Sequence, residues 1–239
     1  TAAPSREAAT PIQLGESHTI QSSILGDGRE INVWLPPAYG EEGRRFSVLY
    51  VVDGALDQDF IHIAGLGQLG ALSWQYEQLI VVGVQTRTRI HELTPPARDA
   101  RYQSVFPNAG GAVDFRRFVE TEVIPFVESH YHTGPRRAIM GESLAGLFVV
   151  DTLLSQPTLF NDYIAISPSL WWDDRALARQ ATDLLARNSV SERRLYLSIA
   201  NEGGTMQDGV DRLRRALGAA SGRVEVHYSD RSASETHAT

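Results

Sequence analysis

Apolar and polar residues follow two kinds of pattern along this chain. In residues 29–36 (REINVWLP) they alternate, which is typical of a strand with one buried face. Other segments are mainly apolar and rich in β-branched residues, as in strands buried on both faces of a parallel sheet. These segments are residues 46–52, 78–84, 136–140, 162–167, 194–200 and 223–229.

Helical patterns occupy the intervals between these segments. Residues 114–131 carry apolar side chains at three- and four-residue spacing, and residues 144–156, 174–188 and 209–220 also read as helices. The alternation predicts an α/β fold, with a mostly parallel central sheet flanked by helices on both faces. In such sheets ligands bind beyond the carboxyl ends of the strands, so we seek candidate chemistry in the loops that follow strands.

Length and composition favour one domain. The chain has 239 residues, 42% of them hydrophobic, and no linker or internal repeat, so we expect a single domain over 1–239 that begins with a polar arm over 1–15. No apolar run approaches the ~18 residues of a membrane span. The net charge of −7, without a basic block, argues against nucleic acid as a partner. The opening TAAPSREAAT is similar to a mature terminus left after signal removal, which predicts a periplasmic or secreted protein.

Ser143 stands where a predicted strand meets a predicted helix, within GESLAG (141–146). A serine nucleophile of an α/β-hydrolase occupies this kind of tight turn, which needs small residues around it. Gly141 meets that need, whereas Ala145 replaces the second glycine of the strict G-x-S-x-G pattern. The alternative is a serine that caps the following helix.

A serine nucleophile needs a histidine base, which follows it in the chain order of this fold. His227 and His237 are the two histidines after Ser143. His227 alternates within 223–229, where packing on the sheet is expected. His237 lies in the polar loop after that strand, the position of the catalytic base, although a surface histidine is the alternative.

Seven segments together give the chain a resemblance to a known family. They are VLYVVDG (48–54), RTRIHELTPP (87–96), residues 114–131, GESLAGLF (141–148), AISPSLWW (165–172), IANEGG (199–204) and ETHAT (235–239). The chain resembles the putative esterase family of α/β-hydrolases, which includes esterase D, feruloyl esterases and siderophore trilactone esterases. The resemblance implies the α/β-hydrolase fold and a nucleophilic role for Ser143. Since the family continues past its histidine into a helix, we expect this sequence to lack that C-terminal helix.

The carboxylate that orients the base has four candidates after strand 194–200: Glu202, Asp208, Asp211 and Asp230. We predict Glu202, because feruloyl esterases of the family carry an aspartate at a similar place. Asp208 stays as an alternative, although it could cap the helix 209–220. Some siderophore esterases of the family work with a serine–histidine dyad, so the acid could also be dispensable.

The oxyanion of an acyl-transfer reaction is normally received by two backbone N–H groups. Leu144, directly after the nucleophile, is expected to supply one of them. By resemblance to the family, Ala55 in the loop after 48–54 supplies the other, with a plain turn at Asp53–Gly54 as the alternative.

Aromatic and basic residues near the same rim are candidates for substrate binding. Trp171 and Trp172 follow strand 162–167, where they either line the pocket or pack in the core. Arg87 and Arg98, in a stretch that also holds Arg89 and Arg101, could bind an anionic substrate. Local pairing with Glu92 and Asp99 is the alternative.

Cofactor and metal sites are not expected. The H-x-H spacing at 130–132 ends a predicted helix, where histidines interact favourably with the C-terminal dipole. The glycines of GLGQLG (65–70) follow no strand and precede no G-K-[ST], so a phosphate loop is not expected either. The absence of cysteine excludes thiolate ligands.

These observations predict a serine carboxylic-ester hydrolase that forms an acyl-enzyme and takes a small-molecule ester. The substrate is a short or medium acyl ester, or a siderophore trilactone. Two alternatives stay open: an acyltransferase that moves the acyl group to an alcohol or sugar, and a non-catalytic binding protein on a hydrolase scaffold.

Overall fold

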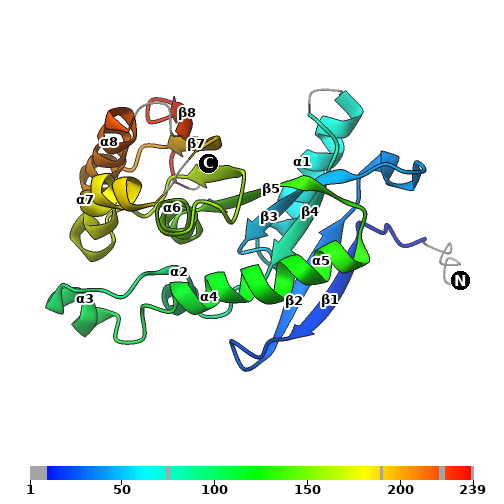
Figure 1. Cartoon of the computed structure of the whole chain (residues 1–239), viewed down its shortest axis with the longest axis horizontal. Coiled ribbons are helices and arrows are strands. Elements are labelled where there is room, and N and C mark those ends of the chain that lie inside the picture. Colours follow the sequence, from blue (N-terminus) through cyan, green and yellow to red (C-terminus); the bar gives the residue numbers. More distant parts are fainter. Residues whose placement is uncertain (1–9, 74–75, 189–190, 221–223, 238–239) are drawn as a thin grey trace, which may run out of the picture.

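The computed structural model describes residues 10–73, 76–188, 191–220 and 224–237. The first nine residues of the polar arm expected over 1–15, and with them most of TAAPSREAAT, lie outside the described residues, as do the last two residues of ETHAT. The described residues form one eight-stranded sheet with helices packed on it (Figure 1).

The sheet has the strand order β1-β2-β4-β3-β5-β6-β7-β8. From β4 to β8 neighbouring strands are parallel, whereas β2 is antiparallel to both β1 and β4. The strands are β1 Glu16–Gln21, β2 Gly28–Trp34, β3 Phe46–Val52, β4 Leu79–Val84, β5 Thr133–Glu142, β6 Asp162–Ile166, β7 Arg193–Ile199 and β8 Val224–Asp230.

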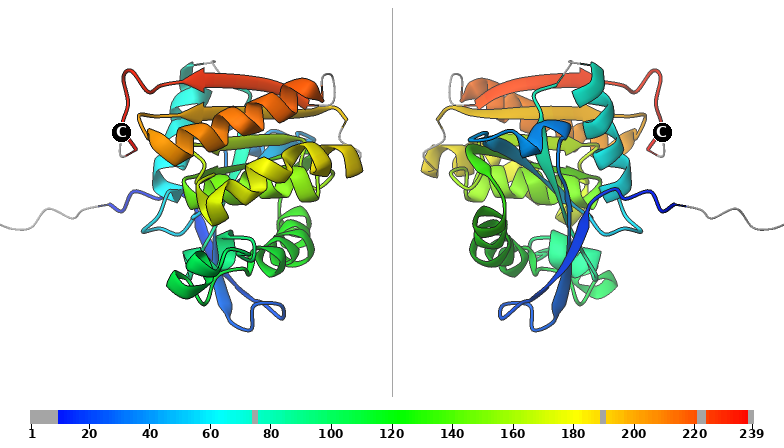
Figure 2. Two further views of the ribbon diagram at one scale, coloured as in Figure 1. Left: turned by 90° about the vertical axis from the view of Figure 1, so that its left-hand side faces the viewer. Right: turned by 90° about the vertical axis from the view of Figure 1, so that its right-hand side faces the viewer.

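Helices cover both faces of the sheet. On one face, Phe60, Ile63 and Ala64 of α1 pack on β3 and β4, and the remaining long helices pack on the opposite face (Figure 2). The helices are α1 Phe60–Ser73, α2 Arg89–Leu93, α3 Ala100–Val105, α4 Ala112–Phe118, α5 Ile124–His130, α6 Leu144–Ser155, α7 Trp172–Arg187 and α8 Gly204–Ala219, with a 3-10 turn at Pro37–Gly40 and a π turn at Val119–Val123. The prediction of an α/β fold with a mostly parallel sheet is confirmed.

Some elements differ from the sequence prediction. The helix predicted over 114–131 runs from α4 to α5 through the π turn, which ends just before Pro125, a residue without an N–H group to donate. The short helices α2 and α3 were not predicted, and neither were β1, a mostly exposed edge strand, and α1, which contains GLGQLG. The three glycines of that segment therefore lie inside a helix rather than in a phosphate-binding loop.

The topology gathers several loops at the carboxyl edge of the sheet. β5 lies between β3 and β6 near the middle, and the segments after β3, β5, β6, β7 and β8 all start at this edge. Residues 53–55, 143, 167–169 and 200–202 therefore lie near one another although they are far apart in the chain.

Candidate active site

Ser143 joins β5 to α6 through a strained backbone. Its φ of 57° and ψ of −116° lie in a region that residues with a side chain rarely adopt. The hydroxyl makes no capping bond to the helix, and its Oγ lies 3.2 Å from the Oγ of Ser169 instead. The side chain therefore does not act as the helix cap that the sequence allowed, and it stands in the geometry of a nucleophile elbow.

Close packing explains how alanine replaces glycine in this turn. A Cβ on Gly141 would lie 2.6 Å from the Cβ of Ala145, and one on Gly146 would lie 2.9 Å from the carbonyl oxygen of Ile166. Ala145 is itself fully buried. The methyl group at position 145 fits because Gly141 leaves room for it.

His237 and Glu202 meet at the same edge of the sheet. The Nδ1 of His237 lies 2.6 Å from Oε1 of Glu202, whose side chain is only 8% exposed. Two backbone bonds dock the histidine loop on the end of β7: Asn201 donates to the Glu235 carbonyl, and Arg231 donates to the Ile199 carbonyl. Because Nδ1 is engaged by Glu202, the ring nitrogen left to face a substrate is Nε2.

Ser143 and His237 line one small cavity of about 290 Å³. The remaining lining residues are Asp53, Gln58, Asp59, Arg89 and Glu142. The structure thus brings the predicted nucleophile, base and acid together, in the chain order expected for the fold.

The competing carboxylates and the other histidine are engaged elsewhere. Asp208 accepts from Arg212 and Arg175, and these hydrogen bonds lower the pKa of its carboxyl. Asp211 pairs with Gln207, and Asp230 with Ser232. His227 stacks on Tyr196 of the neighbouring strand, away from the small cavity.

One predicted oxyanion donor is free in the structure and the other is not. Leu144 is the first residue of α6, so its N–H has no acceptor within the helix. The N–H of Ala55 donates to Oε1 of Gln58 at 3.0 Å, and Gln58 is fixed in turn by Thr86. The prediction for Ala55 therefore does not match this arrangement, because a side chain that follows it in the loop occupies its N–H.

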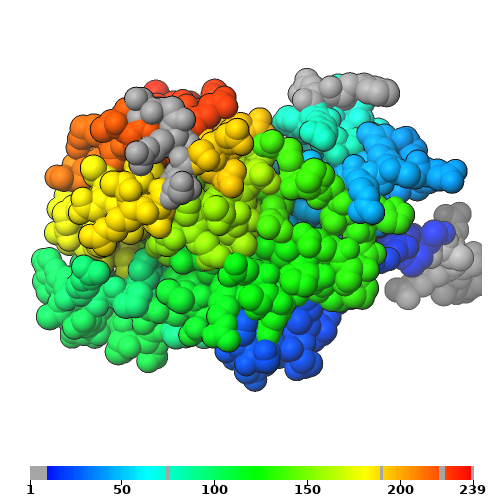
Figure 3. All heavy atoms as spheres, in the orientation of Figure 1, coloured from blue at the N-terminus to red at the C-terminus, as the bar shows by residue number. Residues whose placement is uncertain are grey.

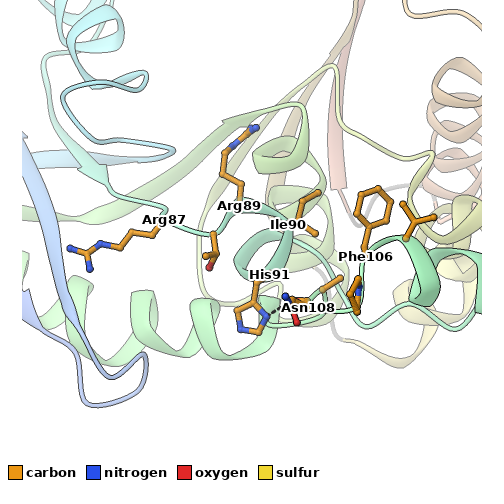
Figure 4. Close-up of a pocket in the computed structure, with 10 residues that line it drawn as sticks. Arg87, Arg89, Ile90, His91, Phe106 and Asn108 are labelled. Atoms are coloured by element: carbon orange, nitrogen blue, oxygen red, sulfur yellow. Dashed lines mark hydrogen bonds between the residues drawn. The ribbon is translucent and has the colours of Figure 1, made fainter.

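Arg89 reaches the cavity, although the sequence analysis did not choose it among the four arginines. Its Nε donates to Oδ2 of Asp53 at 2.9 Å, and Asp53 also accepts from the hydroxyl of Thr86. Asp53 is buried, so the ion pair holds the guanidinium in place beside Ser143. In Figure 4, Arg89 points away from the neighbouring Arg87 and His91. The position of Arg89 within 87–96 offered no signal that separated it from its neighbours.

Two further carboxylates face the same cavity. Burial raises the pKa of Glu142, and the charge of Asp59 raises it further. Burial also raises the pKa of Asp59, with the nearby charge of Asp53 acting in the same direction. The sequence analysis missed both residues, because neither carries a signal apart from its place in the fold.

The predicted binding tryptophans have different environments. Trp172 is only 2% exposed and donates from Nε1 to the carbonyl of Pro95. It is a core residue, which corrects its assignment as a pocket wall. Trp171 is half-buried and lines a separate hollow of about 290 Å³ together with Tyr102 and Phe106.

Of the two predicted binding arginines, only Arg87 lines a described cavity, one of about 1000 Å³ that also includes Arg89. Its guanidinium pairs with Asp27 at 3.2 Å and points away from Arg89 (Figure 4). Arg98 is exposed and bonds through its backbone N–H to Asp173. The alternative of local carboxylate partners is met by Asp99, which pairs with Arg101. The guanidinium of Arg87 pairs with the distant Asp27, and Glu92 accepts the backbone N–H of Arg87.

Two kinds of feature are absent from residues 10–73, 76–188, 191–220 and 224–237. No group of three or more histidine, aspartate or glutamate side chains there is arranged to hold a metal ion. In the same ranges, no helix combines the length and apolar character needed to cross a bilayer.

Comparisons with known proteins identify the family of the chain. Residues 22–235 match the family described as Putative esterase. The Siderophore enterobactin esterase of Emericella nidulans is 31% identical over an alignment of 198 residues. The match covers 73% of this chain and 65% of that protein, just under two thirds of its length.

Solved structures show the same architecture. An IroE-like serine hydrolase from Shewanella oneidensis superposes with a TM-score of 0.82 at 26% identity, over 93% of this chain and 75% of the other. Siderophore hydrolase EstB from Aspergillus nidulans shares the fold with a TM-score of 0.79 at 21% identity, over 98% and 92%. The chain therefore belongs to the putative esterase family and has the α/β-hydrolase fold.

Proposed function

We propose that the chain hydrolyses carboxylic esters through an acyl-enzyme formed on Ser143. The observation that carries this proposal is a serine on a strained elbow that shares a small cavity with a histidine, whose Nδ1 is held 2.6 Å from Glu202. A nucleophile, a base and an orienting carboxylate in this order are the parts that acyl transfer requires.

In the first half of the reaction, Nε2 of His237 accepts the hydroxyl proton of Ser143 as Oγ bonds to the ester carbonyl carbon. The bond to the leaving alcohol then breaks, and the alcohol takes the proton from His237. In the second half, water gives a proton to His237 as its oxygen bonds to the acyl carbon. The bond from that carbon to Oγ of Ser143 then breaks, and Oγ takes the proton from His237, which releases the acid and restores both residues. Glu202 stabilises the imidazolium in both halves.

The charge on the carbonyl oxygen needs donors in place beforehand. We assign the N–H of Leu144 and the guanidinium of Arg89 to this role, since Arg89 is fixed by Asp53 and lines the cavity of Ser143. Ala55 would contribute only if Gln58 released its N–H.

A bulky ester is the substrate class that we favour, with a siderophore ester as the specific candidate. The small cavity around Ser143 shares Arg89 with the cavity of about 1000 Å³, which gives room for a large group beside the scissile bond. A relative named for the siderophore enterobactin supports the same class.

The test combines labelling with turnover. A fluorophosphonate should label the wild-type protein and not Ser143→Ala. A panel of esters of increasing acyl length, run beside a catecholate trilactone with and without an acceptor alcohol, then separates hydrolysis from acyl transfer. Labelling of Ser143→Ala would contradict the assignment of Ser143 as the nucleophile. A wild-type protein that is neither labelled nor active on any ester would contradict the proposal that the chain is an enzyme.

A further inference from the structure

The larger cavity is closed on one side by a segment with little structure of its own. This wall segment, residues 95–109, contributes Val105, Phe106, Pro107, Asn108 and Ala109 to the lining. It meets residues 87–91 at one point, where the carbonyl oxygen of Asn108 lies 2.7 Å from Nδ1 of His91 (Figure 4). Its only regular element is α3, a helix of six residues, none of them buried. The position of the wall segment therefore depends on what it is attached to.

A buried carboxylate provides a further attachment. Asp173 is only 4% exposed, and its two oxygens accept separate backbone N–H groups of the wall segment. Arg98 donates to Oδ2 at 3.0 Å, and Asp99 donates to Oδ1 at 2.8 Å. Hydrogen bonds to an ionised acceptor are among the strong ones, and two of them on one side chain fix the orientation as well as the distance.

Neighbouring residues strengthen the same contact. The hydroxyl of Tyr102 donates to the carbonyl of Trp171, and Nε1 of Trp172 donates to the carbonyl of Pro95, each at 3.0 Å. Phe106 also packs on both tryptophans. Figure 1 places α3 beneath α7, and in Figure 3 their surfaces touch.

The backbone at Asp173 has an unusual conformation. Asp173, Asp174 and Arg175 have φ values of 47°, 48° and 64°, a left-handed run that breaks the first turn of α7. Residues with side chains seldom adopt this conformation, and such strain persists where other contacts demand it. At this position, the strained backbone carries the Asp173 carboxylate, which accepts hydrogen bonds from the wall segment instead of capping α7.

We propose that Asp173 is a positioning residue that holds the wall segment in place, and thereby sets the preference of the enzyme for bulky esters. The inference rests on the proposed esterase function. Asp173 lines none of the described cavities. It acts through Phe106 and its neighbours, and so affects the fit of a large substrate more than the chemistry at Ser143.

The test compares two adjacent aspartates. Asp173→Asn keeps one oxygen acceptor and turns an amide N–H₂ towards a backbone donor. Asp174→Asn is the matched control, because Asp174 has the same residue type and nearly the same φ, but its carboxylate bonds Arg175 and Arg179 rather than the wall segment. Both proteins are assayed with the p-nitrophenyl esters of acetic acid and of 2-naphthoic acid.

Asp173→Asn should raise KM for the naphthoate ester by about tenfold and leave kcat/KM for the acetate ester within about twofold, whereas Asp174→Asn should change neither. An equal loss on both esters, or an unchanged KM for the naphthoate, would overturn the proposal. Tyr102→Phe, which weakens the same attachment from the other side, should shift the naphthoate KM in the same direction by a smaller factor.

A second measurement does not depend on catalysis. Trypsin should cleave after Arg98 or Arg101 about tenfold faster in Asp173→Asn than in the wild type or Asp174→Asn, because local opening exposes the wall segment. Equal cleavage rates would show that Asp173 does not hold it. If the wild type hydrolyses neither ester, the proteolysis alone decides whether the attachment exists, and the esterase proposal is decided by the labelling and the wider ester panel.

Discussion

The nucleophile elbow and the histidine loop are built in opposite ways. The elbow lies in the middle of the sheet, where backbone bonds join Ser143 to Ile166 and Ser169 and the flanking Ala145 is fully buried. The histidine loop, residues 231–237, follows β8 at the edge of the sheet, and most of its residues are exposed. Its attachments include the two backbone bonds to the end of β7 and the bond from His237 to Glu202, and an exposed ion pair joins Arg231 to Glu235 within the loop.

Because of this difference, substitutions in the two regions should affect the stability of the fold and the catalytic activity to different degrees. The elbow is part of the core, so a change there should disturb folding as well as catalysis. The loop contributes little buried surface, so a change there should abolish catalysis and leave folding alone. Of the two catalytic residues, His237 can therefore be substituted with the smaller loss of stability.

The largest effect is expected at the loop. His237→Ala should lower kcat by a factor of about 10⁴ or more, because members of a catalytic triad act as a unit. The melting temperature should stay close to that of the wild type, since the ring is about half exposed. Ester kinetics and thermal unfolding on the same preparation check both statements, and a loss under about tenfold would place the base elsewhere.

Glu202→Gln should come next. It keeps the size of the side chain and removes the charge that stabilises the imidazolium, so kcat should fall by about a hundredfold or more. Asp208→Asn is the matched control, because Asp208 bonds Arg175 and Arg212 rather than His237. Near-wild-type activity in Glu202→Gln would favour a serine–histidine dyad, and an equal loss in Asp208→Asn would contradict the pairing seen here.

At the elbow, Gly141→Ala should destabilise the fold. The added methyl would lie 2.6 Å from both the Cβ and the carbonyl carbon of Ala145, so the free energy of unfolding should fall by about 1–3 kcal/mol. Gly218→Ala near the end of α8 is the control, because a Cβ there meets nothing within 4 Å and alanine favours helix. Chemical denaturation measures both, and equal stabilities would show that the elbow is not tightly packed.

The same contrast explains what could be predicted from sequence. β3 begins and ends at the predicted residues, because a long apolar run in a buried strand is a local signal. β1 was missed because its exposed, polar residues carry no alternation. α1 was missed because Gly65, Gly67 and Gly70 weaken helical propensity, and packing of Phe60 and Ile63 on the sheet outweighs that loss.

The site divides along similar lines. Ser143 was found from a local motif, and His237 from chain order. Arg89 could not be separated from Arg87 and Arg98, because only the ion pair with Asp53, 36 residues away, directs it into the cavity. The engagement of Ala55 by Gln58 is likewise a property of the folded loop, since sequence specifies which residues are near and not which hydrogen bond forms.

The smallest expected effect concerns Glu142, next to the nucleophile. Burial and the charge of Asp59 raise the pKa of Glu142 in the folded state above its unfolded value. A carboxyl with a raised folded pKa favours folding below the unfolded pKa, near 4.3, and loses that contribution as pH rises through the folded pKa. At neutral pH the charged side chain therefore opposes folding, and Glu142→Gln should be the more stable protein.

Because Glu142 is partly exposed, the gain in unfolding free energy at pH 7 should be less than about 1 kcal/mol. It should shrink as the pH falls and disappear below about pH 4, where the wild-type carboxyl is protonated in both states. Asp59→Asn should show the same sign, because burial also raises the pKa of Asp59. The double variant should gain less than the sum of the two, because Asp59→Asn already removes a charge that raises the pKa of Glu142. Urea unfolding at a series of pH values measures all three. A gain that persists at pH 3 would contradict the electrostatic explanation and point instead to better packing of the amide beside Ser143.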